Sequence, residues 1–419
     1  MSPKPIVSLA LALVLAAPVH AGVIVVDLPS GPSAQAAIDA AAPGDILLVK
    51  RSASEPGTDL VLDGKGLTLV ADGAGVGFHG LTVQNVPAGQ QTTVRGFAFS
   101  GAAASWPAHS ALWVSSCAGS VWFDTCSITS PAQLSAGFSG WAPEGPPGAT
   151  VSACSSVLFT GCQVLGGAGA TASADCFVSG SPASVGGAGI AVSASSVVLH
   201  GAIARGGAGG HGGQCTVSRD GGAGVSVADS SSLHFAASFL GGGVGSVPAF
   251  AGVWGSAGPG LLVVDASSTV TRRDSVVLHG AWTPADPDII APPGAVGDYA
   301  APARTLAMTS PLREGHSGAM TIDGELGDLV ALFMTFTGGS LRMAGKQGVF
   351  SLGSPFIGPF FLGSNPSPDG HWVVPFHTPQ LLPATLLGQS FLLQLVIHDG
   401  AQVLFDGTST LTIVDSTIP

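Results

Sequence analysis

The sequence predicts an all-β protein in which a parallel β-solenoid is followed by a small antiparallel β-sandwich. Three observations support this fold class. The middle of the chain repeats a strand pattern at a nearly fixed period, glycine-rich segments separate the repeats, and the last part of the chain changes to short alternating strands joined by turns. A fixed period of several tens of residues indicates structural units that stack on one another.

The chain begins with a segment typical of a secretory signal. Lys4 precedes an apolar run over residues 6–19, and small residues follow up to Ala21. Charge, apolar run and small-residue cleavage site occur in this order in signal peptides, and the run is shorter than the ~20 residues of a membrane-spanning helix. We therefore predict a signal peptide over residues 1–21, an extracellular or cell-surface protein, and no membrane span in the mature chain. A retained N-terminal anchor is the alternative.

The charge of the mature chain excludes one class of partner. Removing residues 1–21 removes one lysine and no acid, so the formal charge changes from −12 to −13. Phosphate backbones select basic surfaces, and this acidic chain has no basic cluster. We therefore expect no nucleic-acid partner.

Five repeats define the predicted solenoid. Each has a β-branched run, a short small or polar stretch and a second β-branched or aromatic run. The second runs align on anchor residues spaced by 36, 40, 36 and 37 positions, namely Val121, Val157, Val197, Leu233 and Val270. Strand alternation places Phe123, Phe159, Leu199 and Phe235 in the next column of the same face. Rungs ~4.8 Å apart would then stack like side chains on like, although a β-sandwich with coincidental spacing remains the alternative. Arg272 and Arg273 interrupt the columns, so we interpret the fifth repeat as the last rung, with a misassigned register as the alternative.

The segment after the signal peptide resembles a known solenoid cap. Residues 33–49 read SAQAAIDAAAPGDILLV and residues 62–70 read LDGKGLTLV. This pattern resembles the N-terminal cap of right-handed parallel β-helix proteins of the pectin-lyase type, in which a short helix covers the open end of the solenoid. The resemblance implies that residues 22–285 form a right-handed parallel β-helix. Ala36, Ala37, Ile38 and Ala40 would form the packed face of the helix, with Asp39 in solvent.

The resemblance also raises the question of catalysis. Lyases of this type need clustered carboxylates for calcium and an arginine base, and the related hydrolases need several close aspartates. The acids here are scattered and no two aspartates are adjacent. Arg272, Arg273 and Asp274 form the densest charge cluster and are the weak catalytic candidates, with solvation of the last rung as the alternative role. We predict no metal site and no cofactor, with calcium expected only if the protein is a lyase.

The cysteines lie within the repeats. An even number of cysteines in a secreted chain is typical of disulfides. Cys126 and Cys162 each lie five residues after an anchor, and Cys117 and Cys154 lie four and three residues before the same anchors. Cys176 and Cys215 lie in adjacent glycine-rich loops. We therefore predict the pairs Cys117–Cys154, Cys126–Cys162 and Cys176–Cys215, with buried thiols as the alternative for the stacked pairs.

Large side chains in the glycine-rich loops are the ligand-binding candidates. Trp141 and Trp254 lie outside the strand columns, and His211 is the only large side chain of its segment. Exposed aromatic rings can stack on sugars, but they can also form a local core. Trp113 and Trp122 lie in strands and are predicted to be structural. The expected partner is a polysaccharide or the extracellular matrix.

The pattern changes after the repeats. Residues 286–304 are predicted to form a proline-rich linker. Alternating strands follow at 318–323, 328–337, 350–352, 371–376, 391–397, 402–405 and 409–414. Strands at this spacing indicate a β-sandwich over residues 305–419.

Three functions are compatible with this sequence. The protein is a non-catalytic binder of glycan or matrix through its glycine-rich loops, a polysaccharide lyase or glycoside hydrolase, or a structural and adhesive surface protein. Low charge and scattered carboxylates favour the first and third functions. The resemblance in fold favours the second, but fold alone does not imply function.

Overall fold

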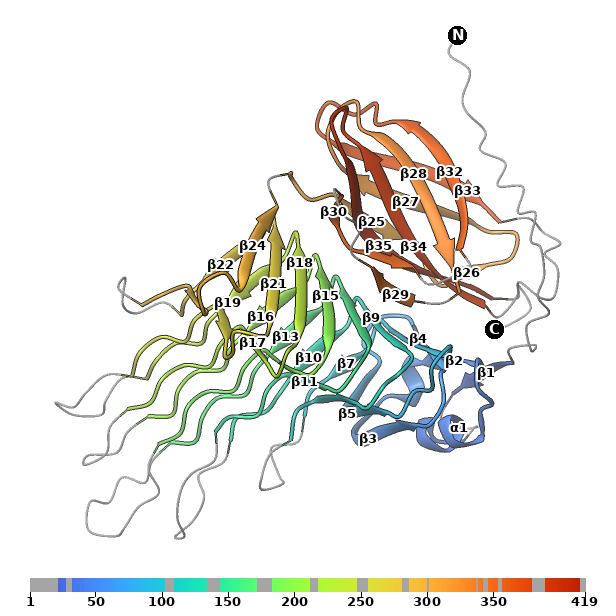
Figure 1. Ribbon diagram of the computed structural model, residues 1–419. Helices are drawn as coiled ribbons and strands as arrows, with labels where there is room; N and C mark the ends of the chain where they lie inside the picture. Colours follow the sequence, from blue (N-terminus) through green and yellow to red (C-terminus); the bar gives the residue numbers. More distant parts are fainter. Residues whose placement is uncertain are drawn as a thin grey trace, which may run out of the picture.

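The computed structural model describes residues 22–27, 32–101, 109–133, 144–171, 183–211, 218–246, 255–280, 286–299, 301–336, 338–341, 346–352, 356–378 and 389–414. A solenoid occupies the first part of the chain, and a sandwich of antiparallel strands lies against its side (Figure 1). The predicted all-β fold class, a parallel β-helix followed by antiparallel sheets, is confirmed.

Three faces of parallel strands form the solenoid. The first face is a ten-stranded sheet of β1 (Val23–Val26), β2 (Ile46–Lys50), β4 (Thr68–Asp72), β6 (Gln91–Arg95), β9 (Ser120–Asp124), β12 (Ser156–Thr160), β15 (Ser196–His200), β18 (Ser232–Ala236), β21 (Thr269–Arg273) and β24 (Val296–Tyr299). The other two faces share the long strand β5 (Gly77–Gln84) and so form one fourteen-stranded sheet.

The second and third faces are the two arms of that sheet. The second face contains β3 (Glu55–Asp63), β5, β8 (Leu112–Ser115), β11 (Ala149–Ser152), β14 (Ile190–Ser193), β17 (Val225–Ala228), β20 (Leu261–Val263) and β23 (Ile289–Ile290). The third face contains β7 (Ala98–Phe99), β10 (Ser127–Thr129), β13 (Gln163–Leu165), β16 (Ile203–Arg205), β19 (Phe239–Gly241) and β22 (Val276–Leu278). A complete rung, such as β11, β12 and β13, supplies one strand to each face.

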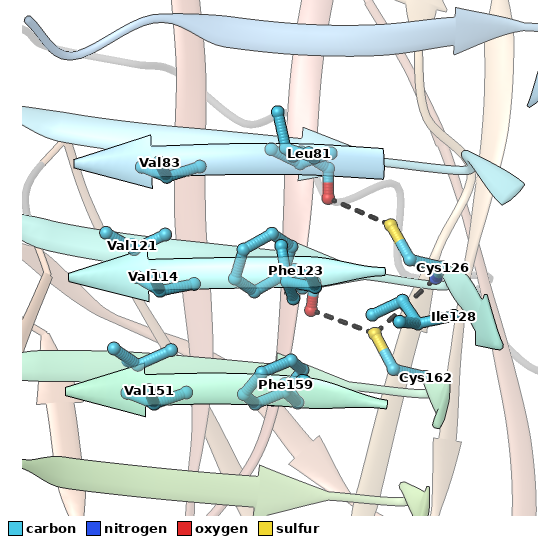
Figure 2. Close-up of a cluster of buried hydrophobic side chains, with 14 of the residues drawn as sticks. Leu81, Val83, Val114, Val121, Phe123, Cys126, Ile128, Val151, Phe159 and Cys162 are labelled. Carbon is cyan, nitrogen blue, oxygen red and sulfur yellow. Dashed lines mark hydrogen bonds between the residues drawn. The ribbon is translucent and has the colours of Figure 1, made fainter. Parts of the chain in front are cut away.

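The predicted register of the repeats is confirmed. Val157 aligns with Val121 on one side and Val197 on the other, and Leu233 aligns with Val197 and Val270. The rings of Phe123 and Phe159 stack inside the solenoid with centroids 5.0 Å apart (Figure 2). Like side chains therefore lie on like along the axis and bury a continuous core.

The end of the solenoid differs from the prediction. The fifth repeat is not the last rung, because β24 pairs with β21 and β23 pairs with β20. Both strands fall within the predicted linker 286–304, so the solenoid continues to Tyr299. The composition of this rung is proline-rich because its strands β23 and β24 have only two and four residues, so that turns make up most of it.

A short helix lies at the N-terminal end of the solenoid. Helix α1 (Ala34–Ala40) begins after Ser33, whose hydroxyl accepts a hydrogen bond from the Ala36 amide at 3.2 Å. Lys65 donates hydrogen bonds to the carbonyl oxygens of Ile38, Asp39 and Ala41. Its positive charge therefore lies at the C-terminal end of the helix, where the helix dipole favours it. A 3₁₀ turn, η1 (Arg51–Ala53), follows β2.

The packed face of α1 is rotated from the prediction. Ala37 and Ile38 are buried and Asp39 is exposed, as predicted, but Ala36 and Ala40 are also exposed, and Ala34 is buried instead. A spacing of three to four residues between the buried positions explains the difference.

Two ladders of small side chains follow the turns on either side of the first face. One ladder contains Cys117, Cys154, Ser195, Ser231 and Ser268, and the other contains Cys126, Cys162, Ala202, Ser238 and Ser275. The backbone amide of one rung donates to the sulfur or hydroxyl oxygen of the next, as from Cys126 to Cys162 at 3.4 Å and from Cys154 to Ser195 at 2.9 Å. Except at Ser268, the residue before a ladder position has a left-handed backbone, for example Ala153 with φ 52° and Gly161 with φ 58°.

Two predicted disulfides are not formed, although the cysteines expected to pair are neighbours in adjacent rungs. Cys117 is level with Cys154 and Cys126 with Cys162, yet all four are free thiols. The thiols of Cys126 and Cys162 each donate to a carbonyl oxygen of the preceding rung, that of Val94 and that of Phe123 (Figure 2). Translation along the stack separates equivalent atoms by the rung spacing of ~4.8 Å, whereas a disulfide needs its two sulfurs ~2.05 Å apart. Cys176 and Cys215 lie outside the described residues.

We predict that these four thiols stay reduced and inaccessible in the folded protein. In a Cys176→Ser/Cys215→Ser variant, a thiol reagent such as DTNB should modify none of them before unfolding and all four in denaturant without reductant. Burial also raises the pKa of the Cys162 thiol well above its ordinary value, which further slows its reaction. Unfolded protein without free thiols would contradict the prediction and indicate disulfides.

The C-terminal unit is a sandwich of two antiparallel layers. One layer contains β25 (Thr305–Met308), β27 (Ser317–Asp323) and β33 (His371–His377). The other contains β26 (Leu312–Arg313), β28 (Leu329–Thr335), β30 (Gln347–Gly348), β32 (Phe356–Ser364), β34 (Gln389–His398) and β35 (Val403–Val414), of which β26 and β30 run parallel to β35. A separate pair is formed by β29 (Gly338–Leu341) and β31 (Phe350–Leu352). The last two predicted strands are one strand, β35, and β32 had no strand signal because glycine and proline interrupt it.

Candidate functional site

Glycine-rich arms project from one corner of the solenoid, between the third face of one rung and the second face of the next (Figure 1). Outgoing arms follow β10, β13, β16 and β19 and cover residues 130–133, 166–171, 206–211 and 242–246. Returning arms precede β11, β14, β17 and β20 and cover residues 144–148, 183–189, 218–224 and 255–260. We call these eight segments the arm bundle.

Backbone hydrogen bonds join the two sets of arms into one lattice. In one set of these bonds, the amide of one arm donates to a carbonyl oxygen of the next arm, and outgoing and returning arms alternate along the stack. The donor and acceptor residues are Gly167 to Pro146, Gly187 to Gly167, Gly207 to Gly187, Gly222 to Gly207, Gly243 to Gly222 and Gly258 to Gly243, at 2.7–2.9 Å. A second set joins arms of the same kind in neighbouring rungs, as from the Gly166 amide to the Arg205 oxygen at 2.8 Å. The bundle is therefore held by backbone bonds rather than by a side-chain core.

Glycine is required in this lattice because the chains are too close for a side chain. A β-carbon on Gly207 would lie 2.0 Å from the Gly167 oxygen, and one on Gly187 would lie 2.2 Å from the Pro146 oxygen. Along the arm after β16, Arg205 and His211 are exposed and Gly206 and Ala208 are partly buried, whereas Gly207, Gly209 and Gly210 are buried. Glycine therefore occupies the crowded positions of the arm.

The arm bundle places the bases of four successive loops next to one another. At its outer end the Gly210 amide donates to the Ser184 oxygen at 2.8 Å, and the Ser246 hydroxyl donates to the Gly210 oxygen at 2.6 Å. His211 is exposed at this end. The loops themselves, residues 134–143, 172–182, 212–217 and 247–254, lie outside the described residues, and with them Trp141 and Trp254.

A single methyl group should disrupt the arm bundle. We predict that Gly207→Ala lowers the free energy of unfolding by about 1–3 kcal/mol, the usual cost of overpacking, because its β-carbon would overlap the backbone of Gly166 and Gly167. The neighbouring Ala208→Ser is the matched control, because residue 208 is a partly exposed position of the same arm. Thermal unfolding of both variants measures the difference, and equal stabilities would contradict a packed bundle.

The predicted catalytic cluster is divided between two places, because Arg272 and Asp274 line one surface pocket with Asp298 whereas Arg273 is buried against the sandwich. Arg272 forms an ion pair with Asp298 of β24, whereas the fully buried Arg273 forms one with Asp406 of β35. Asp274 accepts a hydrogen bond from the Ala303 amide at 3.1 Å. Each of the three residues has a different partner, and alternation places Arg273 on the side opposite to Arg272. Within the described ranges, no three His, Cys, Asp or Glu side chains are grouped as a metal site would require.

The outward side of the first face is covered by the sandwich. Trp122, Leu158 and Val198 form one outward column, and they pack against apolar residues that include Phe350 and Phe405. Trp122 is buried, as predicted for a structural residue, but Trp113 is 41% exposed on the outer side of β8. The three apolar residues of the outward column were the signal in the sequence that could have shown this covered face.

Buried charges connect the two units beside this apolar contact. Arg95 donates to Asp124 at 2.6 Å, to the Thr410 oxygen at 2.6 Å and to the Met308 oxygen at 2.9 Å. The Arg273–Asp406 pair crosses the same interface. A buried ion pair of this kind makes separation of the units costly, because each charge would lose its partner.

Two titratable groups in the interface have shifted pKa values. Burial, and then the charge of Arg273, lower the pKa of His200 to about 3. Burial raises the pKa of Asp406 to about 6, opposed by Arg273 and two backbone amides. His200 is therefore neutral in the folded protein at ordinary pH, and Asp406 is ionised above about pH 6.

These shifts predict how stability depends on pH. Below pH 6.5 the unfolded chain protonates His200 and the folded protein does not, so His200 lowers the free energy of unfolding as pH falls toward 3. Asp406 acts in the opposite direction between pH 6 and 3.8, where the folded form takes up the proton first. His200→Gln should therefore remove a loss of up to about 3 kcal/mol between pH 6.5 and 4. Urea unfolding at both pH values tests this, and parallel losses in the variant and the parent would contradict it.

Comparisons of this chain with protein-family models, with curated proteins and with solved structures find no match. In the part of the chain that the structure describes, no helix has the length and apolar character needed to cross a membrane.

Proposed function

We propose that this chain is a secreted or cell-surface β-helix protein that binds a polysaccharide or the extracellular matrix without catalysis, through the loops at the outer end of the arm bundle. The hydrogen-bonded bundle carries this proposal. It supports four loops in successive rungs, and a binding surface made from loops gains affinity when its supports are already ordered.

The order of the loops favours an extended ligand. Trp141 belongs to the first loop and Trp254 to the fourth, so their loop bases lie three rungs, or about 14 Å, apart along the stack. A polymer chain that runs along the stack passes all four loop bases, and aromatic residues of the loops can stack on its sugar units. The accessible positions of the arms near the loops are mostly small or polar, which suits hydroxyl groups rather than a charged polymer.

We also propose that the solenoid is right-handed and belongs to the pectin-lyase-like superfamily, and that residues 1–21 are removed on secretion. The support is the order of α1, β2 and β4, followed by rungs with one strand on each of three faces. The assignment concerns ancestry and fold, and the separation of Arg272, Arg273 and Asp274 is the reason why we do not extend it to catalysis.

The test is retention of residues 22–419 on immobilised neutral and acidic polysaccharides. We expect retention on at least one polymer, and a Trp141→Ala/Trp254→Ala variant should lose at least tenfold in affinity. Trp113→Ala is the matched control, because Trp113 is an exposed tryptophan on a strand away from the loops.

The same incubations should be followed for unsaturated or reducing ends, with and without calcium. We expect none. Product formed only with calcium would contradict the proposal and identify the protein as a lyase. Product formed without calcium would identify it as a hydrolase. Binding that the double variant retains in full would show that the loops are not the binding surface.

A further inference from the structure

A cavity of about 360 Å³ lies between the solenoid and the sandwich. Its solenoid wall comes from the ends of the strands of the first face, and its other wall comes from β25 and from residues 407–409 of β35. This volume is within the range of ~300–1,000 Å³ that is usual for small-molecule sites. It is distinct from the loops of the proposed function and does not depend on them.

Two glycines create the space on the solenoid side. Thr125, Gly161 and Gly201 occupy the same left-handed turn position in three successive rungs, with φ of 52°, 58° and 57°. The rungs before and after Gly161 and Gly201 use Thr125 and Ala237 there, so this turn does not itself demand glycine. A β-carbon added to Gly201 would meet nothing within 4 Å, so this glycine faces open space rather than a crowded backbone.

A buried histidine in the wall has an unused polar atom. His200 is 4% exposed and lines the cavity, and its Nε2 has no hydrogen-bond partner among the described residues. Buried polar atoms are nearly always paired, so an orphan of this kind indicates a missing partner. Thr160 and Thr408, whose hydroxyls are 3.1 Å apart, face one another from the two units at the same cavity.

The charges in the wall are already neutralised by protein groups. Arg95 is paired with Asp124, and Arg304 with Asp328 at 2.6 Å. The imidazole of His200 is neutral, so a charged ligand would find no free counter-charge here. Leu306, Ala307 and Met308 add a mostly apolar strand to the opposite wall.

We propose that this cavity binds one neutral, hydroxyl-rich molecule of the size of a monosaccharide. A hydroxyl group can serve as donor or acceptor to the threonine hydroxyls of the wall and, once the imidazole turns toward the ligand, to the buried His200 Nε2. The C–H face of a sugar ring fits against the apolar side of β25. Because both units line the cavity, the ligand also stabilises their association, since binding to the closed form alone shifts the equilibrium toward it.

Calorimetric titration of residues 22–419 with single sugars tests the proposal. The probes are glucose, galactose, mannose, N-acetylglucosamine and, as the charged counterpart, glucuronate and galacturonate. We expect at least one neutral sugar to bind with one site per chain, at least tenfold more tightly than either uronate, and to raise the melting temperature. No binding by any neutral sugar, or equal binding of a uronate, would overturn the proposal.

Two variants locate the site. Gly201→Asn places a side chain in the cavity at a left-handed position that asparagine tolerates, and His200→Leu removes the unpaired nitrogen. Both should weaken binding at least tenfold. Gly64→Asn is the control, because its φ of 69° is similar and its β-carbon also meets nothing within 4 Å, but it does not line the cavity. Unchanged binding in both cavity variants would overturn the proposal, whereas loss in the Trp141→Ala/Trp254→Ala variant alone would place the sugar at the loops.

Discussion

The structure depends on one constraint, which is that each rung lies directly on the previous one without a shift in register. From β9 to β21 the anchor residues Val121, Val157, Val197, Leu233 and Val270 stay level, although the chain between them varies in length. Side-chain alternation has a period of two, so a slip of one residue would turn the buried column outward. The polar ladders reinforce the register, because each amide donates to the equivalent position of the next rung.

The same register makes the arm bundle geometrically feasible. Arms that leave equivalent corners of successive rungs start at the rung spacing, and outgoing and returning arms pack so closely that several positions have no room for a β-carbon. Glycine at the crowded positions lets the backbones bond to one another, as Gly187 and Gly207 show. The low charge and high glycine content of the chain are thus consequences of its packing as well as of its surface chemistry. A bundle of this kind can extend far from a hydrophobic core because its hydrogen bonds are internal.

The C-terminal sandwich covers the outer side of the first face and does not add rungs to the solenoid. Its residues cover the outward column of Trp122, Leu158 and Val198, and its Asp406 neutralises Arg273. This explains why Arg273 can occupy a fully buried position, since a charge taken from water needs a partner. The cavity with both units in its wall lies at the two glycine turns, Gly161 and Gly201.

Much of the solenoid can be predicted from the sequence alone, because the same residue pattern occurs in each of the repeats. The rung register, the level of the cysteine pairs, the N-terminal helix and most strands of the sandwich can be read from patterns in residue type. Only the tertiary structure decided that the four cysteines act as ladder residues, because thiol orientation depends on the carbonyl groups of the preceding rung. It alone also decided that Arg272, Arg273 and Asp274 have three different partners, two of them in later strands. Contacts such as Arg95 with Thr410 join residues far apart in the chain, and no local pattern encodes them.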